Sequence, residues 1–370
     1  MVNSLQNEYH PDSVSAPGET LSETLDTLGM SQTELARRMD RPIKTINEII
    51  QGKAAITAET ALQLEQVLRI PASFWLKREQ QYREALARLA EEQRLALWTE
   101  WIKTFPIREM IRRGWLPPCN SKTQQVFEVL KFFGVASPDA WEGIWERQVV
   151  RYRRSATNSN LGVVTTWLRQ GEIQAQEVET RPYNEAAFRN ALHYIRSLTR
   201  KPVNFFQEEL VRACAEAGVT VVFVQELPGT GICGAARWLT PTKALVQLSL
   251  RYKTDDQLWF TFFHEAGHIL LHGKRQLFLD LEMDPESDEE SENQANTFAA
   301  DVLVSPSEWR RFVAHKSYRK KVDIQMFAQK MGIAPGIVVG RLQHEKLLSF
   351  AYCNGLKRKL EWTHDLHPYA

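Results

Sequence analysis

The segment that most constrains the fold of this 370-residue chain is TFFHEAGHILLH, at residues 261–272. An α-helix through it places His264 and His268 one turn apart on the same face. Glu265 then projects about 100° around the helix from His264. Gly267 leaves room for a second element to approach closely, and the flanking phenylalanines and leucines predict that the helix is buried.

Two imidazoles on one helix face can bind the same metal ion, and a hydrolytic zinc site needs three protein ligands. The third ligand must come from another segment. ESENQANTFAADVLVS, at 290–305, predicts a helix with Glu292 and Asn296 one turn apart. We predict Glu292 as the third ligand of a Zn²⁺ ion, and Asn296 as the acceptor for the free ring N–H of a zinc-bound histidine. His272 continues the four-residue step but drifts off the ligand face, so we expect it to be a supporting or surface residue.

This arrangement predicts hydrolytic chemistry. The zinc would activate a water molecule, and Glu265 would take the water's proton and pass it to a leaving amine. The alternative is a helix that carries two solvated histidines and binds no metal.

The residues before this helix predict a small α+β domain. FFQEELVRACAEAG predicts a helix, and VTVVFVQEL, ICGAARWL and KALVQLSLR are strand candidates by their β-branched and alternating apolar residues. We expect a small antiparallel sheet, whose strand at 243–251 could also pair with an extended peptide. Thr254 and Gln257 have capping-box spacing and predict the start of the histidine-bearing helix.

The N-terminal segment predicts several short helices. Ser31 with Glu34 indicates the start of the second helix, Pro42 opens the third, and Thr57 caps the fourth. The periodicity points six residues of the second and third helices inward: Leu35, Ala36, Met39, Ile46, Ile49 and Ile50.

Two short helices joined by a tight turn predict a helix-turn-helix unit, whose second helix lies in the major groove of double-stranded DNA. We predict that its DNA contacts are Gln32, Arg41, Lys44, Thr45, Asn47 and Lys53. Phosphate contacts of this kind make the affinity salt-dependent. The alternative is a helical bundle with no role in DNA binding.

The composition of the chain limits the compartment and the kinds of partner that we expect. The chain has 46 Lys and Arg against 45 Asp and Glu, so any nucleic-acid surface must be local. The four cysteines form no C-x-x-C pair, which favours a reducing compartment. No signal peptide or bilayer-length apolar run is recognisable, so we expect a cytoplasmic protein with no membrane partner.

A second helix-turn-helix-like pattern follows in VDIQMFAQKMGIAPGIVVGRLQHEKLL. Gly336 and Val339 fall on the expected exposed side of its second helix and are poor groups for base contacts, while Lys330 and Arg341 remain for phosphate. A packing or partner-binding role is therefore favoured over independent DNA reading.

Residues 17–82, with INEII-x-GK followed by IT-x-x-TAL, resemble the XRE-type helix-turn-helix domain of HigA-like antitoxins. Residues 205–310, with HEAGHILLH followed by ENQAN-x-FAAD-x-LV, resemble the ImmA/IrrE family of zinc metallopeptidases. Two positions depart from these patterns: Ile43 stands where the first family often has a polar or basic residue, and Gln294 where the second often has glutamate. The second resemblance implies His264, His268 and Glu292 as metal ligands and Glu265 as the catalytic carboxylate.

The expected fold is mainly α and multidomain. The predicted order is a flexible tail (1–17), a helix-turn-helix domain (18–90), a helical connector (91–201), an α+β zincin-like peptidase domain (202–312), a helix-turn-helix-like helical unit (313–350) and a tail (351–370).

The predicted function is that of a zinc-dependent endopeptidase coupled to a DNA-binding regulatory head. The resemblances imply an operator duplex as one partner and a regulatory protein, such as a repressor or a toxin, as the substrate; the chain could also pair as a homodimer. The alternative is an antitoxin-like transcriptional repressor whose peptidase-fold domain is an inert sensor.

Overall fold

The chain forms two compact units, Met1–Thr99 and Glu100–Ala370. The computed structural model describes residues 15–146, 161–272, 277–281 and 289–361. Of the predicted tails, residues 1–14 and 362–370 lie outside the described residues.

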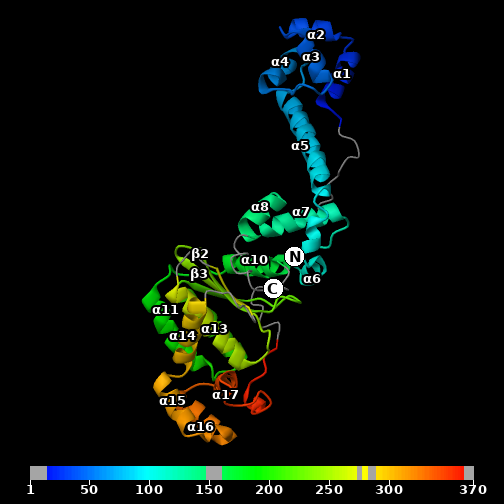
Figure 1. Cartoon of the computed structure of the whole chain (residues 1–370). Helices are drawn as coiled ribbons and strands as arrows, with labels where there is room; N and C mark the ends of the chain where they lie inside the picture. Colours follow the sequence, from blue (N-terminus) through cyan, green and yellow to red (C-terminus); the bar gives the residue numbers. More distant parts are fainter. Residues whose placement is uncertain (1–14, 147–160, 273–276, 282–288, 362–370) are drawn as a thin grey trace. The chain divides into compact units, whose positions relative to one another are not determined.

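The first unit contains five helices within residues 15–99, joined by short turns (Figure 1). They are α1 (Pro17–Thr27), α2 (Gln32–Arg38), α3 (Ile43–Ile50), α4 (Ala58–Leu68) and α5 (Ala72–Ala96). Two predicted helix starts are confirmed, because the Ser31 hydroxyl accepts the N–H of Glu34 at 3.1 Å and that of Thr57 accepts the N–H of Thr60 at 3.2 Å. Pro42 is the N-cap of α3 and not a residue of its first turn.

The core of this unit contains the residues that the helical pattern points inward. Leu35 and Ala36 of α2 and its C-cap residue Met39 are buried, as are Ile46 and Ile49 of α3. Ile50, the sixth residue that the pattern points inward, is half-buried against the same core. They belong to one apolar cluster that is completed by residues of α1, α4 and α5. Burial of this stripe holds α2 and α3 in a fixed relation and leaves their polar faces to solvent.

The second unit has helices on both faces of a small sheet (Figure 1). In chain order its elements are η1 (Trp101–Thr104), α6 (Ile107–Arg112), α7 (Lys122–Phe133), α8 (Pro138–Trp141), the π-helical turn η2 (Glu142–Glu146), α10 (Leu161–Glu177), α11 (Glu185–Leu198), α12 (Val203–Glu216), β1 (Val219–Phe223), β2 (Ile232–Thr240), β3 (Lys243–Leu248), α13 (Asp255–Leu271), β4 (Leu277–Leu281), α14 (Glu289–Leu303), α15 (Pro306–Ala314), η3 (Ser317–Arg319), α16 (Lys321–Met331), α17 (Pro335–His344) and η4 (Asn354–Leu356). The mainly helical, multidomain fold class is therefore confirmed.

The sheet is mixed, with strand order β1-β3-β2-β4. β2 pairs antiparallel with β3 and with β4, but β1 and β3 are parallel, so the prediction of an antiparallel sheet is wrong for that pair. After the turn that follows β2, β3 returns between β2 and β1 and so runs in the direction of β1. Local alternation identifies strands but not their neighbours. Both edges of β3 are occupied, so the strand at 243–251 cannot pair with an added peptide.

The two faces of the sheet follow from the alternation along β3. Val246 and Leu248 point into the large core shared with α11, α12 and α13. Gln247 points to the opposite face, where α10 packs, and its Nε2 donates to the Trp167 carbonyl at 2.7 Å. At Gly171 of α10 an added Cβ would lie 1.9 Å from Gln247 Oε1. The polar face that the alternation indicates is therefore covered by a helix and is not solvated.

Candidate metal centre and helix-turn-helix surface

The histidine-bearing helix is α13, and a segment near the end of the described chain holds its first turn. Thr254 is the N-cap residue, but its side chain makes no capping hydrogen bond, so the predicted capping box is wrong. Instead, the N–H of Asp255 donates to the Arg358 carbonyl and the N–H of Arg358 donates to Asp255 Oδ1, both at 2.9 Å. Lys357 forms an ion pair with Asp256 at 2.7 Å. The C-terminal segment therefore supplies the cap.

α17 packs directly against the same turn. A Cβ added at Gly336 would lie 2.5 Å from Asp255 Oδ1, and one at Gly340 would lie 2.5 Å from Asp256 Oδ2. Val339 is also completely buried. The prediction that Gly336 and Val339 lie on the exposed side of this helix is therefore wrong, because Gly336 packs closely against α13 and Val339 belongs to the core. The packing role that the sequence favours for this unit is what the contacts show.

The two cations predicted for phosphate contact in this C-terminal unit have partners within it. Lys330 forms an ion pair with Glu308 at 2.5 Å. Arg341 lies over the ring of Trp309, at 4.3 Å from the centroid, and donates to the Ala300 carbonyl at 3.1 Å. Both side chains stabilise the packing of α14, α15, α16 and α17.

Asp255 makes the stability of this junction depend on pH. Burial raises the pKa of its carboxyl to about 6, although the N–H of Arg358 opposes the shift. Because the folded state binds the proton more tightly than the unfolded chain, the stability that protonation contributes is present below about pH 4 and is lost as the pH rises through about 6. We expect Asp255→Asn to be more stable than the parent by on the order of 1–3 kcal/mol at pH 7.5, with a smaller difference at pH 4.5.

Urea unfolding of both proteins in the presence of a chelator, at the two pH values, measures this effect. Asp301→Asn, which changes an exposed carboxylate of α14, is the control. A difference between Asp255→Asn and the parent that is the same at both pH values would contradict the assignment.

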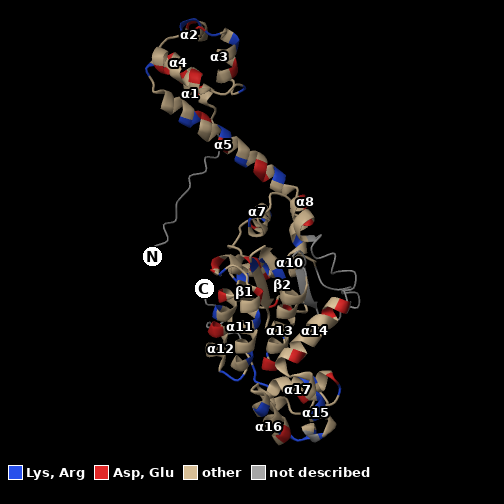
Figure 2. Cartoon of the chain, turned by 90° about the vertical axis from the view of Figure 1, so that its left-hand side faces the viewer, with Lys and Arg blue, Asp and Glu red and all other residues tan. Residues whose placement is uncertain are grey.

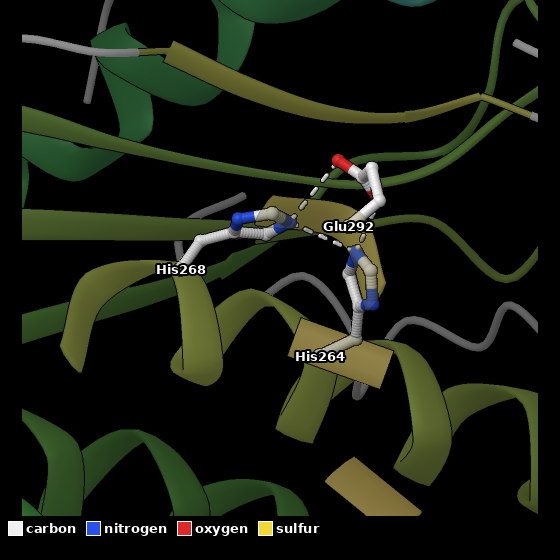
Figure 3. Close-up of side chains that lie close together, drawn as sticks. All are labelled: His264, His268 and Glu292. Carbon is white, nitrogen blue, oxygen red and sulfur yellow. Dashed lines mark hydrogen bonds and ion pairs between the residues drawn. The ribbon is translucent and has the colours of Figure 1, made fainter. Parts of the chain in front are cut away.

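The structure brings together the three side chains predicted as metal ligands (Figure 3). His264 and His268 come from α13 and Glu292 from α14, and their candidate donor atoms lie within 4.8 Å of one another. The two Nε2 atoms are 3.0 Å apart, and Glu292 carboxylate oxygens lie 3.2 Å from that of His264 and 3.4 Å from that of His268. Ligands about 2 Å from a tetrahedral zinc ion lie about 3.3 Å apart, so these spacings and this donor set fit zinc.

The protonation of this cluster also suits a metal. Burial lowers the pKa of His268 to about 4, against the opposing hydrogen bond with Glu292, so the ring is neutral at pH 7. Burial alone would raise the pKa of the Glu292 carboxyl, but hydrogen bonds from His264 and His268 outweigh it and hold the pKa at about 2. A neutral imidazole and an ionised carboxylate are the forms that bind a cation.

α14 also supports the first histidine. His264 Nδ1 lies 3.0 Å from Asn296 Oδ1, the contact that we predict for a ligand histidine whose Nδ1–H donates. The two helices approach closely at Gly267, where an added Cβ would lie 3.1 Å from Phe298 Cδ1 and 3.3 Å from Ala295 Cα. The expectation that this glycine admits another element is confirmed.

Glu265 is completely buried where α13 packs on β2. A Cβ added at Gly234 of β2 would lie 2.6 Å from Glu265 Oε1 and 2.6 Å from Thr261 Cγ2. Gly234 therefore provides the space that the carboxyl occupies. The role of Gly234 was not predicted from the sequence: a glycine inside a strand signals a close approach, but nothing local identifies the approaching group.

In the first unit, α2, the turn at 39–42 and α3 form the predicted helix-turn-helix pair. Asp40 in the turn has φ of 50°, a left-handed conformation that lets the chain reverse. Lys44, Asn47 and Lys53 are exposed, and Gln32 and Thr45 are half-buried. Basic and acidic residues are mixed along these helices (Figure 2).

The basic side chains of the helix-turn-helix pair differ in how strongly other side chains of the unit bind them. Arg41 forms an ion pair with Glu59 at 3.1 Å and a hydrogen bond with Gln63, so it ties the turn to α4. Lys44 is only 3.8 Å from Glu48 at its closest, and its side chain is 85% exposed. Lys44 is therefore the more available group for a phosphate or a base.

Family comparisons assign both regions. Residues 217–343 match the IrrE N-terminal-like domain of Peptidase M78, and residues 21–75 match a helix-turn-helix family. The chain therefore carries a helix-turn-helix DNA-binding domain of the XRE type and a domain of the M78 metallopeptidase family. Both resemblances drawn from the sequence are confirmed, and the M78 match extends to α17, consistent with the packing of that helix on α13.

Individual relatives match only part of the chain. It is 36% identical over 88 residues to virulence-associated protein A of Dichelobacter nodosus, covering 24% of this chain and 82% of that protein. Over these 88 residues this chain belongs to the same family as virulence-associated protein A. It is 38% identical over 60 residues to the uncharacterized HTH-type transcriptional regulator YddM of Escherichia coli K12, covering 16% and 64% of the two chains.

One solved structure, of an addiction module antidote protein of the HigA family from Coxiella burnetii, is 31% identical to this chain. The match covers 24% of this chain and 91% of the antidote protein, with a TM-score of 0.20.

None of the helices in the described part of the chain has the length and apolar content needed to cross a membrane.

Proposed function

We propose that the second unit is a zinc-dependent endopeptidase and that the helix-turn-helix head directs or regulates it on DNA. The observation that carries this proposal is the convergence of two imidazoles and one carboxylate from α13 and α14 within 4.8 Å. Membership of the M78 family supports it, because a metallopeptidase needs such a donor set. The substrate would be a regulatory protein, such as a repressor or a toxin.

His264, His268 and Glu292 would hold the zinc. When bound, zinc acts as a Lewis acid that polarises the scissile carbonyl and lowers the pKa of water. Glu265 would accept the proton of the attacking water on a carboxylate oxygen and deliver it to the leaving amine. Asn296 would keep His264 in the tautomer whose Nε2 lone pair is available, since its Oδ1 accepts from Nδ1.

The test of this function combines metal analysis with a cleavage screen. We expect about one zinc per chain, and cleavage of a repressor or toxin protein that a chelator abolishes and added zinc restores. Bound zinc without cleavage of any candidate would favour the inert sensor domain instead. A protein that binds no zinc would contradict both.

We propose further that α3 binds the major groove of an operator duplex. The exposed Lys44 and Asn47 of this helix, together with Thr45, would face base edges, while Gln32 and Lys53 would face phosphates. Arg41 could add to the phosphate contacts only by leaving Glu59. Two copies bound to half-sites one helical turn apart would require a homodimer.

Variants separate these two kinds of contact. We expect Asn47→Ala to cost about 1–3 kcal/mol and to relax specificity at one base position. We expect Lys53→Ala to weaken binding to all sequences alike and to reduce the salt slope by about one. Lys77→Ala, an exposed cation on α5, is the matched control.

Fluorescence anisotropy on an operator selected from random duplexes, at several salt concentrations, measures both effects. Unchanged affinity and specificity in Asn47→Ala would contradict the proposal that α3 binds in the major groove.

A further inference from the structure

His272 ends α13 and turns its ring back toward the candidate metal centre. It is the C-cap residue, and its N–H donates to the His268 carbonyl at 3.1 Å, which fixes the backbone there. Its Nδ1 lies 3.0 Å from Nδ1 of His268, and its Nε2 lies 3.2 Å from Gln294 Oε1. The Gln294 amide donates to Glu290 Oε1 at 3.3 Å. Three hydrogen bonds thus connect a predicted metal ligand to the start of α14.

The direction of each hydrogen bond follows from the one before. His268 presents Nε2 to Glu292 and to the other ligand, so a metal bound there requires the ring proton on Nδ1. His272 must then accept at Nδ1 and carry its own proton on Nε2. That proton can be donated to Gln294 Oε1, which leaves the Gln294 NH₂ group to donate to Glu290. The series ends at a carboxylate, which only accepts when ionised.

We infer that His272, Gln294 and Glu290 hold the ring of His268 in the orientation and tautomer that a metal ion needs, which makes His272 a positioning residue of the centre. This inference rests on the proposed metal site. His272 would then do for His268 what Asn296 does for His264, because each accepts a hydrogen bond from Nδ1 of a ligand histidine. α14 then contributes a ligand at 292 and the support for both histidines.

A glutamine suits position 294 because an amide both accepts and donates. Its Oε1 accepts from His272 and its Nε2 donates to Glu290, so the series continues to a carboxylate outside the predicted ligand set. The departure at Gln294 from the family pattern is therefore compatible with a working centre, with Glu292 as the ligand.

Zinc affinity, measured by competition with a chromophoric chelator, tests the inference in the full-length protein. We expect His272→Ala to weaken zinc binding by about 10–100-fold, the range for partners of metal-bound histidines. Gln294→Leu should also weaken it, whereas Gln294→Glu, which retains an acceptor for His272 but loses the donor to Glu290, should bind zinc more tightly than Gln294→Leu. His193→Ala, an exposed histidine on α11, is the control. A purely structural role would not separate leucine from glutamate at position 294.

Nitrogen-15 NMR of labelled histidines supplies a second readout. In the zinc-loaded parent we expect the proton of His268 on Nδ1 and that of His272 on Nε2. Zinc affinity within twofold of the parent in both His272→Ala and Gln294→Leu, or a His272 proton on Nδ1, would overturn the inference while leaving the three ligands intact. A parent that takes up no zinc would overturn the metal site and the inference together.

Discussion

Replacing Glu265 with glutamine is expected to lower kcat/KM for peptide-bond cleavage by about 10²–10⁴-fold, the range for loss of a general base. The amide cannot take the proton from the attacking water. Glutamine has nearly the same shape as glutamate, so it fits the space opposite Gly234. Because Glu265 is not among the three ligands, the zinc content should not change.

Initial rates on a protein substrate found by the cleavage screen, with zinc measured on the same samples, test this expectation. Glu216→Gln, which changes an exposed carboxylate on α12, should cleave at the parental rate. Two results would contradict the assignment: activity within about tenfold of the parent, or loss of zinc together with activity. The second would make Glu265 a ligand.

Replacing Glu292 with alanine is expected to weaken zinc binding by more than about 100-fold, since partners outside the ligand set already contribute 10–100-fold. Removing this carboxylate also leaves two buried imidazoles beside a cation without a negative charge to balance it. Asp301→Ala, an exposed carboxylate on the same helix, is the control. If zinc affinity in Glu292→Ala equals that of Asp301→Ala, another group is the third ligand.

The features that could be predicted are those encoded within a few residues of one another. The starts of α2 and α4 depend on a hydroxyl and an N–H three residues on, at Ser31 and Thr57. The spacing of His264 and His268 on one face depends only on helical geometry. Glu292 is a partial exception: the chemistry of zinc requires a third ligand, and the acidic helix offered a carboxylate one turn before a suitable amide.

The features that could not be predicted depend on pairs far apart in the chain. Asp255 and Arg358 are 103 residues apart, so nothing near Thr254 indicates that the C-terminal segment caps α13. Gly336 has the spacing of a reading helix, but its actual neighbour is Asp255. The parallel pairing of β1 with β3 likewise depends on where β2 lies, which alternation does not specify.

The proposed function depends on one zinc ion bound by His264, His268 and Glu292. An anomalous difference map, recorded at the zinc absorption edge on crystals of the full-length protein, would locate this ion. We expect one peak at about 2.0–2.2 Å from His264 Nε2, His268 Nε2 and a Glu292 oxygen. A peak bound by other side chains, or no peak between α13 and α14 in zinc-saturated crystals, would contradict it.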